Sequence, residues 1–376
     1  MKILMCIFDI ENLGGIINHA EHLTHGLNAL GHEVYLYKIV DKEVIRRGGA
    51  SLKGTATGPL GIPFDQLRGW VFPQDRIVPF KSINWKRFTK KFDLVLWEVP
   101  YPPISKFKSD PKKLYSTSVP QIPFIHDGNM VKMYPELSKF KNRFEFFACV
   151  HDCAMGNTKH MGLEDRSRLI VNPQVIGNRM VKPNFKRRRR VCCSFQTFKR
   201  WKRVDDLVRS VPRIDGKVIV GGGGIEYYYM TSKTKRRPQY GRIWEEAIDA
   251  GMKYLGYISE DERDLVMEKS RLLIDTSWSR GYNKYGSHFN RIMVDAAIKG
   301  CLPVLRDLAM DDNSVFPYWL YESIPFDCDS EYFANKVNSI LSMDGAKANK
   351  MVSGIQNIIK TKFDSVVVAK ELMKGV

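Results

Sequence analysis

The segment that decides the fold reads YLGYISEDERDLVMEKSRLLIDTSWSR at residues 254–280 and YGSHFNRIMVDAAIKGCLPVL at residues 285–305. Its hydrophobic pattern predicts three short strands: one that ends at 255–257, one at 272–274 and one at 303–305. An amphipathic helix separates the first two strands and a second helix precedes the third. Strands that alternate with helices predict an α/β fold with a parallel sheet, which binds ligands at the carboxyl ends of its strands.

The start of the chain repeats this pattern. A predicted strand at 3–8 leads into a polar loop that ends in Gly14-Gly15, and a helix with one apolar face follows. Gly31 stands where a helix C-cap glycine belongs, and the next strand is predicted at 34–37. The glycine pair lies between strand and helix, where the backbone can approach a ligand closely, although a plain tight turn is the competing interpretation.

Later strands of the first half end in polar residues. Strands are predicted at 92–98, 122–125 and 148–150, and the second of them is followed directly by His126 and Asp127. These two side chains are therefore expected at the ligand-binding edge of the first sheet.

A length of 376 residues exceeds what one hydrophobic core usually supports, so two domains are expected. We predict a first domain at 1–177, a basic linker at 178–190, a second domain at 191–360, and a C-terminal helix at 361–376 that packs back on the first domain. Residues 45–90 show little periodicity and are expected to form an insertion or long loop region.

The charge indicates the kind of partner. Lys and Arg number 59 against 41 Asp and Glu, for a net charge of +18. Such an excess favours a polyanion, either nucleic acid or an anionic membrane surface, over a surface that is merely basic for solubility. No stretch approaches the roughly 18 apolar residues that span a bilayer, and the seven cysteines show no disulfide spacing. We expect a monomeric cytoplasmic protein without an integral membrane segment.

The motifs in their order resemble GT-B glycosyltransferases of the retaining family 4 type. The resemblance is carried by the segments 30–34, 218–224, 255–258, 276–279 and 295–304. It implies two Rossmann-like domains that face each other across a donor-binding cleft. It also implies a UDP-sugar, most simply UDP-glucose, as co-substrate, with no obligatory metal.

Within this family the chain is most similar to phage DNA α-glucosyltransferases. The similarity rests on His126-Asp127, on Trp201-Lys202 and on the segment 300–305. It implies transfer of a sugar to 5-hydroxymethylated pyrimidines in duplex DNA, in the host cytoplasm and with retention of the anomeric configuration.

The family holds the donor diphosphate with an Arg and a Lys five residues apart. Lys202 matches the Lys, but Thr197 stands at the Arg position, so Lys199 or Arg200 would have to replace it. Cations suit this role because negative charge grows on the departing diphosphate. Solvated surface lysines and arginines are the competing interpretation. Further donor-binding residues that the resemblance implies are Gly14, Gly15, Gly256 and Tyr257.

The family also uses two acids eight residues apart on the donor. Asp295 matches the second acid, which would hold the ribose, but Ser287 stands in place of the first. His288 could substitute for the missing carboxylate. The competing interpretation of Asp295 is an acid placed near a helix N-terminus by its interaction with the dipole.

His126 and Asp127 are the candidate catalytic residues. Either could orient the sugar, and Asp127 could accept the proton of the acceptor hydroxyl. A structural turn is the competing interpretation, and no protein nucleophile is assigned. His19, His22 and His25 recur every three residues, so they drift around the helix and predict no metal site.

Basic segments are expected to follow DNA phosphates. The candidate residues are Arg187, Arg188, Arg189, Arg190, Lys235, Arg236 and Arg237. Two other functions stay open. The same chemistry could act on a lipid-linked sugar or polysaccharide at an anionic membrane, or the chain could be a DNA-binding GT-B protein without catalysis, as Thr197 and Ser287 would allow.

Overall fold

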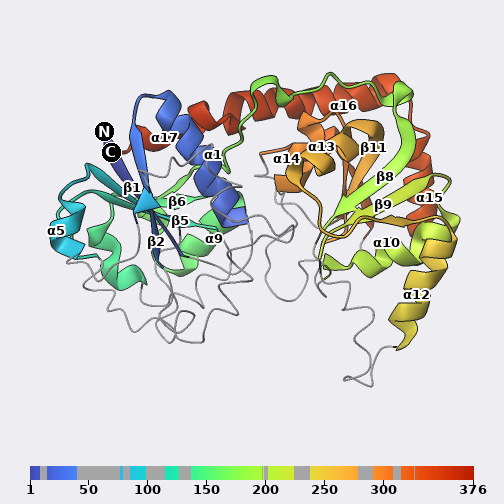
Figure 1. The fold of residues 1–376 in the computed structure, drawn as a ribbon, viewed down its shortest axis with the longest axis horizontal. Coiled ribbons are helices and arrows are strands. Elements are labelled where there is room, and N and C mark those ends of the chain that lie inside the picture. The colour runs from blue at the N-terminus through green and yellow to red at the C-terminus, as the bar shows by residue number, and fades with distance from the viewer. Residues whose placement is uncertain are drawn as a thin grey trace. The chain divides into compact units, whose positions relative to one another are not determined.

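The computed structural model describes the residues 1–8, 15–39, 77–78, 85–98, 115–126, 137–196, 198, 202–223, 238–277, 291–307, 315–325 and 327–376. They form two compact units (Figure 1). Unit 1 comprises residues 1–175 and 361–376, and unit 2 comprises residues 176–360. Among the described residues, no helix combines the length and the hydropathy that crossing a bilayer requires.

Unit 1 is built on a parallel sheet with the strand order β3-β2-β1-β4-β5-β6-β7. The strands are β1 (Lys2–Phe8), β2 (Glu33–Ile39), β3 (Ile77–Val78), β4 (Leu94–Trp97), β5 (Gln121–Ile125), β6 (Phe147–Cys149) and β7 (Ser167–Leu169). The chain winds outward in one direction up to β3 and in the other from β4. The switch point of this doubly wound sheet therefore lies between β1 and β4.

Both faces of this sheet are covered. The helices of unit 1 are α1 (Gly15–Ala29), α5 (Trp85–Thr89), α9 (Asp152–His160) and α17 (Ser365–Met373). Successive residues of β1 point to opposite faces: Met5 packs in a core with Leu23 of α1, whereas Leu4 packs in a second core with Trp85 of α5. Burial on both faces explains why the strands are continuously apolar.

Unit 2 contains a second parallel sheet, in the order β10-β9-β8-β11-β12-β13. Its strands are β8 (Arg189–Phe195), β9 (Lys217–Gly221), β10 (Lys253–Tyr254), β11 (Ser270–Asp275), β12 (Leu302–Asp307) and β13 (Glu322–Pro325). Its helices are α10 (Val204–Ser210), α12 (Pro238–Asp249), α13 (Glu260–Lys269), α14 (Arg291–Ile298), α15 (Ser330–Leu341) and α16 (Gly345–Ile358). The switch point here lies between β8 and β11.

The segment that decided the prediction folds largely as expected. Helix α13 begins at a capping box, in which Ser259 accepts from the Glu262 amide and the Glu262 side chain accepts from Ser259. Helix α14 is followed by Gly300 at φ +73°, and β11 pairs with β12 in parallel. The first strand was predicted too late: β10 ends at Tyr254, because Gly256 at φ +65° turns the chain away from the sheet.

The expected basic linker at 178–190 lies inside unit 2, where β8 already begins at Arg189. Helix α17 packs against α1 within unit 1, with Ser365 Oγ 3.0 Å from His25 Nδ1. The region 45–90 lies mostly outside the described residues.

Candidate functional site

The switch point of unit 1 carries a buried carboxylate between two histidines. Glu98 directly follows β4, His19 lies on α1, and His126 directly follows β5. Glu98 Oε2 lies 2.9 Å from His19 Nδ1 and 2.9 Å from His126 Nε2. Glu98 and His19 are fully buried, whereas 12% of the His126 side chain is exposed. The cluster therefore opens toward solvent on the side of His126.

The main chain of His126 is fixed by a third histidine. His151, the N-cap of α9, accepts the Ala154 amide at its Nδ1, 3.0 Å away. Its Nε2 therefore carries the proton and donates to the His126 carbonyl at 3.1 Å. His126 is therefore held by hydrogen bonds to both its side chain and its backbone.

Electrostatics keep Glu98 ionised. Burial raises the pKa of this carboxyl, but the charge of His19 and hydrogen bonds from both imidazoles lower it more, to about 2. At neutral pH Glu98 is a carboxylate and can only accept hydrogen bonds, so the facing nitrogens of His19 and His126 both carry protons.

The same three residues are the one group of metal-ligating side chains found within the described residues. Their ligand atoms lie within 4.8 Å of one another. Carboxylate oxygen and imidazole nitrogen stand at hydrogen-bonding distances, which the two N–H donors explain without an ion. His22 and His25 take no part in this cluster: His22 Nδ1 accepts the Val175 amide at 2.9 Å, and His25 contacts α17.

The switch point of unit 2 is built around Lys202. Lys202 Nζ donates to Ser277 Oγ at 3.0 Å, and Ser277 Oγ donates to Gln196 Oε1 at 3.0 Å. The Thr276 hydroxyl donates to the Lys202 carbonyl at 2.7 Å. Gln196 follows β8 while Thr276 and Ser277 follow β11. Ser277 contacts the ammonium group, Thr276 binds the main chain of Lys202, and Gln196 supports Ser277.

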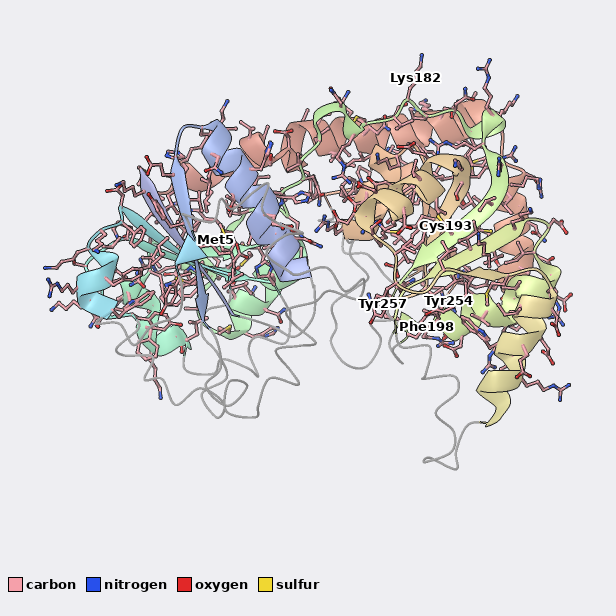
Figure 2. All side chains as sticks on the ribbon, viewed as in Figure 1. Met5, Lys182, Cys193, Phe198, Tyr254 and Tyr257 are labelled. Atoms are coloured by element: carbon pink, nitrogen blue, oxygen red, sulfur yellow. The ribbon has the colours of Figure 1, made fainter. Side chains whose placement is uncertain are left out.

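Two glycines after β9 allow the main chain to pack closely against neighbouring residues of this site. Gly222 has φ +134°, and a Cβ there would lie 1.9 Å from the Gln196 carbonyl oxygen. A Cβ on Gly223 would meet the ring of Tyr257, 1.8 Å from its Cζ. Tyr257 is half exposed, and Figure 2 shows it beside Phe198 and Tyr254 at this edge of unit 2. Main chain after β9 therefore lies against Gln196 and against the ring of Tyr257.

Asp295 lies fully buried on α14. Its Oδ2 accepts from Arg263 Nη2 at 2.9 Å, and Arg291 Nε lies 3.6 Å away. Its other oxygen, Oδ1, is buried and has no donor within the described part of the chain. A ligand hydroxyl would supply the missing hydrogen bond.

The basic run after η5 (Phe185–Arg187) is divided in its roles. Arg188 is buried and donates to the carbonyls of Met267, Ser270 and Lys299, so the prediction that it contacts DNA is wrong. A buried guanidinium whose two terminal nitrogens donate to carbonyls is not available to a phosphate. Arg187, Arg189 and Arg190 are exposed. Arg190 also donates to Asp215 O and Ser342 Oγ.

Several candidate residues lie outside the described residues. They are Gly14, Asp127, Thr197, Lys199, Arg200, Ser287, His288, Lys235, Arg236 and Arg237. Gly15 is described as the first residue of α1.

Glu98, His19, Gln196 and Ser277 were not among the residues predicted for the site. The available signal for Glu98 was its position directly after an apolar strand. The four residues of that strand are all buried in the structure. His19 carried no signal, because its partner is 79 residues away in the chain.

No protein-family model matches the chain, and no curated protein matches its sequence significantly. Solved structures match it over its whole length. HepE (Alr3699) of Anabaena in complex with UDP is 14% identical with a TM-score of 0.66, covering 100% of this chain and 99% of its own.

Two further structures are similar to the same degree. The lipopolysaccharide outer core galactosyltransferase WaaB is 15% identical with a TM-score of 0.62, and the match covers 100% of this chain and 99% of WaaB. A variant of TarM from S. aureus, in complex with fondaparinux, alpha-GlcNAc-glycerol and UDP, is 11% identical with a TM-score of 0.66 and the same coverage. At these identities the likeness establishes the fold alone, and that fold is GT-B.

Proposed function

We propose that this chain is a glycosyltransferase that takes its sugar from a UDP-sugar and carries the donor site in unit 2. The observation that carries the proposal is Lys202, which is held at the switch point between β8 and β11 by Ser277 and Thr276. Ligands of doubly wound sheets bind at this point. HepE, which shares the fold, is complexed with UDP-glucose in one of its structures.

Sugar transfer from UDP requires a cation at this point and backbone that can approach the donor closely. When the sugar leaves, negative charge grows on the β-phosphate of UDP, and a preorganised ammonium group stabilises it. Gly222 and Gly223 allow the backbone to approach the donor without a side chain in the way. Lys202 is the proposed phosphate ligand, with Lys199 or Arg200 as its partner.

The rest of the donor is assigned to three residues of unit 2. The unpaired Oδ1 of Asp295 would accept a ribose hydroxyl, as its match in the family 4 pattern implies. Tyr257 and the backbone of Gly256 would contact the uracil ring. Ser287 or His288 would hold the sugar in place of the missing acid.

For the acceptor we propose a 5-hydroxymethylated pyrimidine in duplex DNA, glucosylated with retention. The net charge of +18 supports a polyanionic acceptor, and His126-Asp127 match the DNA α-glucosyltransferase pattern. The base would have to leave the helix to meet the sugar. His126 would orient the reacting groups, and Asp127 would take the hydroxyl proton.

Transfer assays with purified protein test the proposed acceptor and the proposed use of a UDP-sugar. The protein is incubated with UDP-glucose, UDP-galactose or UDP-GlcNAc, with and without hydroxymethylcytosine or hydroxymethyluracil duplex, and the nucleosides are analysed by mass spectrometry. A glycosylated nucleoside is the expected result. UDP release without DNA product would overturn the acceptor, and failure to bind or turn over any UDP-sugar would overturn the enzyme itself.

A second acceptor class is favoured by one surface. Tyr318 and Trp319 are 75% and 63% exposed, and their helix η9 (Tyr318–Leu320) packs on α16, which carries the exposed Lys347 and Lys350. Exposed aromatics beside lysines suit an anionic membrane interface, where a lipid-linked sugar or polysaccharide would be the acceptor. Turnover on extracted lipid-linked glycans but not on DNA would select this alternative.

A further inference from the structure

The basic run before β8 lies at the amino edge of the sheet of unit 2. β8 begins at Arg189, which pairs with Ser270, the first residue of β11. Gln196 and Ser277, which belong to the proposed donor site, follow the carboxyl ends of the same two strands. A strand of seven residues spans roughly 20 Å, so Arg187 and Arg189 are separated from the donor site by about this distance along β8 (Figure 1).

Two other arginines fix the main chain of this run from within. Arg188 donates to three carbonyls of unit 2, as described above. Arg271 of β11 donates to the carbonyls of Lys186 and Arg188, at 3.3 and 3.1 Å. Arg187 and Arg189, which flank Arg188 in the chain, are exposed. The backbone that carries them is therefore held in place before any partner binds.

The positive charge at this edge is only weakly compensated. Arg187 and Arg189 form no ion pair with the described part of the chain. Burial lowers the pKa of the Arg271 guanidinium, and the charge of Arg190 beside it lowers this pKa further. Like charges that repel one another on a fixed backbone favour an anionic partner with several charges of its own.

We infer that Arg187 and Arg189 form an anchoring surface for duplex DNA at the amino edge of unit 2, separate from the surface that receives the reacting base. This inference rests on the proposed function for the identity of the polyanion. Guanidinium groups bind phosphate oxygens in a bidentate geometry, and such contacts position a duplex without reading its sequence. The anchoring surface therefore raises the affinity for DNA of any sequence.

The composition of the run favours a duplex over an anionic bilayer. Residues 182–190 expose no large apolar side chain, since Phe185 is only 3% exposed. Helices that bind a bilayer surface combine basic residues with apolar side chains that enter the headgroup region. The exposed aromatic residues Tyr318 and Trp319 belong instead to η9. A phosphate backbone requires only the charge that the arginines supply.

The separation of the two edges predicts a dependence on duplex length. B-DNA rises roughly 3.4 Å per base pair, so a distance of roughly 20 Å corresponds to about six base pairs along a straight duplex. A hairpin of about eight base pairs with a central hydroxymethylcytosine is too short to reach the anchoring surface. A duplex of about 40 base pairs can contact both edges.

The first test measures binding and needs no turnover. Unmodified 40-base-pair duplex is titrated at about 0.1 M salt, and fluorescence anisotropy reports the affinity. Arg187→Gln with Arg189→Gln should weaken binding by about tenfold or more, because two phosphate contacts are lost. Arg187→Lys with Arg189→Lys keeps the charge and should retain most of the affinity. Equal binding by the wild type and the Gln variant would overturn the inference, whether or not any sugar is transferred.

The matched control removes two charges from unit 1. Lys90 and Lys91 are exposed after α5, and Lys90→Gln with Lys91→Gln should leave the affinity for DNA nearly unchanged. An equal loss in both variants would show that DNA responds to the net charge alone, which contradicts a localised surface. Phosphatidylglycerol vesicles are then tested in place of DNA. If the arginine variant loses binding to vesicles but not to DNA, the surface binds a membrane and the inference is wrong.

Transfer assays separate anchoring from catalysis. On the 40-base-pair hydroxymethylcytosine duplex, Arg187→Gln with Arg189→Gln should raise the KM for DNA by about tenfold, with kcat and the KM for the UDP-sugar unchanged. On the short hairpin the variant and the wild type should have the same KM. A fall in kcat on both substrates would place these arginines in the transfer site and contradict the inference. Absence of transfer by the wild type would reject the proposed acceptor, and the binding result would then decide the anchoring surface alone.

Discussion

Single residues determine the geometry of the proposed donor site. Lys202 reaches Ser277 because the chain turns sharply behind it: Arg203 adopts φ 45°, a left-handed conformation that costs a non-glycine residue about 1 kcal/mol or more. Arg203 is held there by a bidentate contact with Asp206, at 2.8 and 2.9 Å. Asp206 in turn contacts the buried Arg306 at 3.0 Å. Strain at Arg203 is thus offset by ion pairs and directs Lys202 to the switch point.

Lys202→Met is the first prediction. It removes the ammonium group while nearly preserving side-chain length, so kcat with a UDP-sugar should fall by about a hundredfold or more, because the leaving diphosphate loses its counter-charge. Lys217→Met is the matched control, since Lys217 is exposed at the amino end of β9. Equal kinetics for both variants would remove Lys202 from the site.

Gly222 and Gly223 should respond differently to alanine. Gly222→Ala combines φ +134° with a clash against a main-chain carbonyl, and it should lower the free energy of unfolding by about 2 kcal/mol or more. Gly223→Ala meets only the half-exposed ring of Tyr257, which can swing away. It should keep its stability and lose affinity for UDP. Denaturant unfolding and UDP titration calorimetry measure the two effects, and similar behaviour of both variants would contradict the geometry.

The depressed pKa of Glu98 predicts how stability depends on pH. The carboxyl has its pKa near 2 when folded against 4.5 ordinarily, so it stabilises the fold above pH 4.5 and loses this contribution as pH falls toward 2. About 2.5 pKa units correspond to a contribution on the order of 3 kcal/mol. The stability gap between wild type and Glu98→Gln should be largest near neutral pH and should narrow in acid. Denaturant unfolding at pH 7, 5 and 3.5 checks this, and a constant gap would contradict the shift.

At the scale of elements, unit 1 includes a helix from the C-terminal end of the chain. Helix α17 packs against α1, and the parallel bridge between Gln174 and Asp364 joins the two chain segments of unit 1. Gly26 makes the helix contact possible, because a Cβ there would lie 2.0 Å from the Ser365 carbonyl oxygen. The absence of one side chain thus allows the two helices to pack closely.

Gly26→Ala should therefore destabilise unit 1 by about 2 kcal/mol or more, since the obstacle is main chain that cannot move aside. Gly156→Ala in α9 is the control: nothing lies within 4 Å of its Cβ, and alanine in a helix should gain about 0.5–1 kcal/mol. Hydrogen exchange of α1 and α17 reports the change locally. An unprotected α17 in the wild type would show that the packing is absent in solution.

At the scale of the whole molecule, the charge of +18 predicts electrostatic association with duplex DNA. Counterion release should weaken binding by about a thousandfold between 50 and 200 mM salt if some six phosphates are contacted. Arg187→Gln with Arg189→Gln should reduce the salt slope by about 2, because both side chains are exposed beside the buried Arg188. Fluorescence anisotropy measures both.

The paired control replaces the exposed Lys347 and Lys350 of α16 by Gln. It removes the same charge from a different surface and should leave the salt slope for DNA nearly unchanged. If the α16 substitutions change the salt slope more than those at Arg187 and Arg189, the DNA contact lies elsewhere. DNA binding that does not depend on salt would contradict contacts to the phosphates.

The sequence by itself determined the doubly wound α/β architecture and the place of its polar edges. Strand, cap and helix signals act within a few residues, which is why the capping box at Ser259 and the glycine after α14 could be predicted from adjacent positions. It also placed His126 at the carboxyl end of a predicted strand, while Lys202 and Asp295 came from the resemblance to family 4 glycosyltransferases.

Only the tertiary structure decided which side chains meet. Glu98 and His19 are separated by 79 residues and come together because β1 and β4 are neighbours at the switch point. Arg188 looks like its basic neighbours in the chain, yet it lies buried among carbonyls just before β8 begins. Local sequence patterns determine the helices and strands. Burial and long-range pairing depend instead on the order in which the strands join the sheets. Burial and pairing in turn determine the charge of each side chain and which groups it can reach.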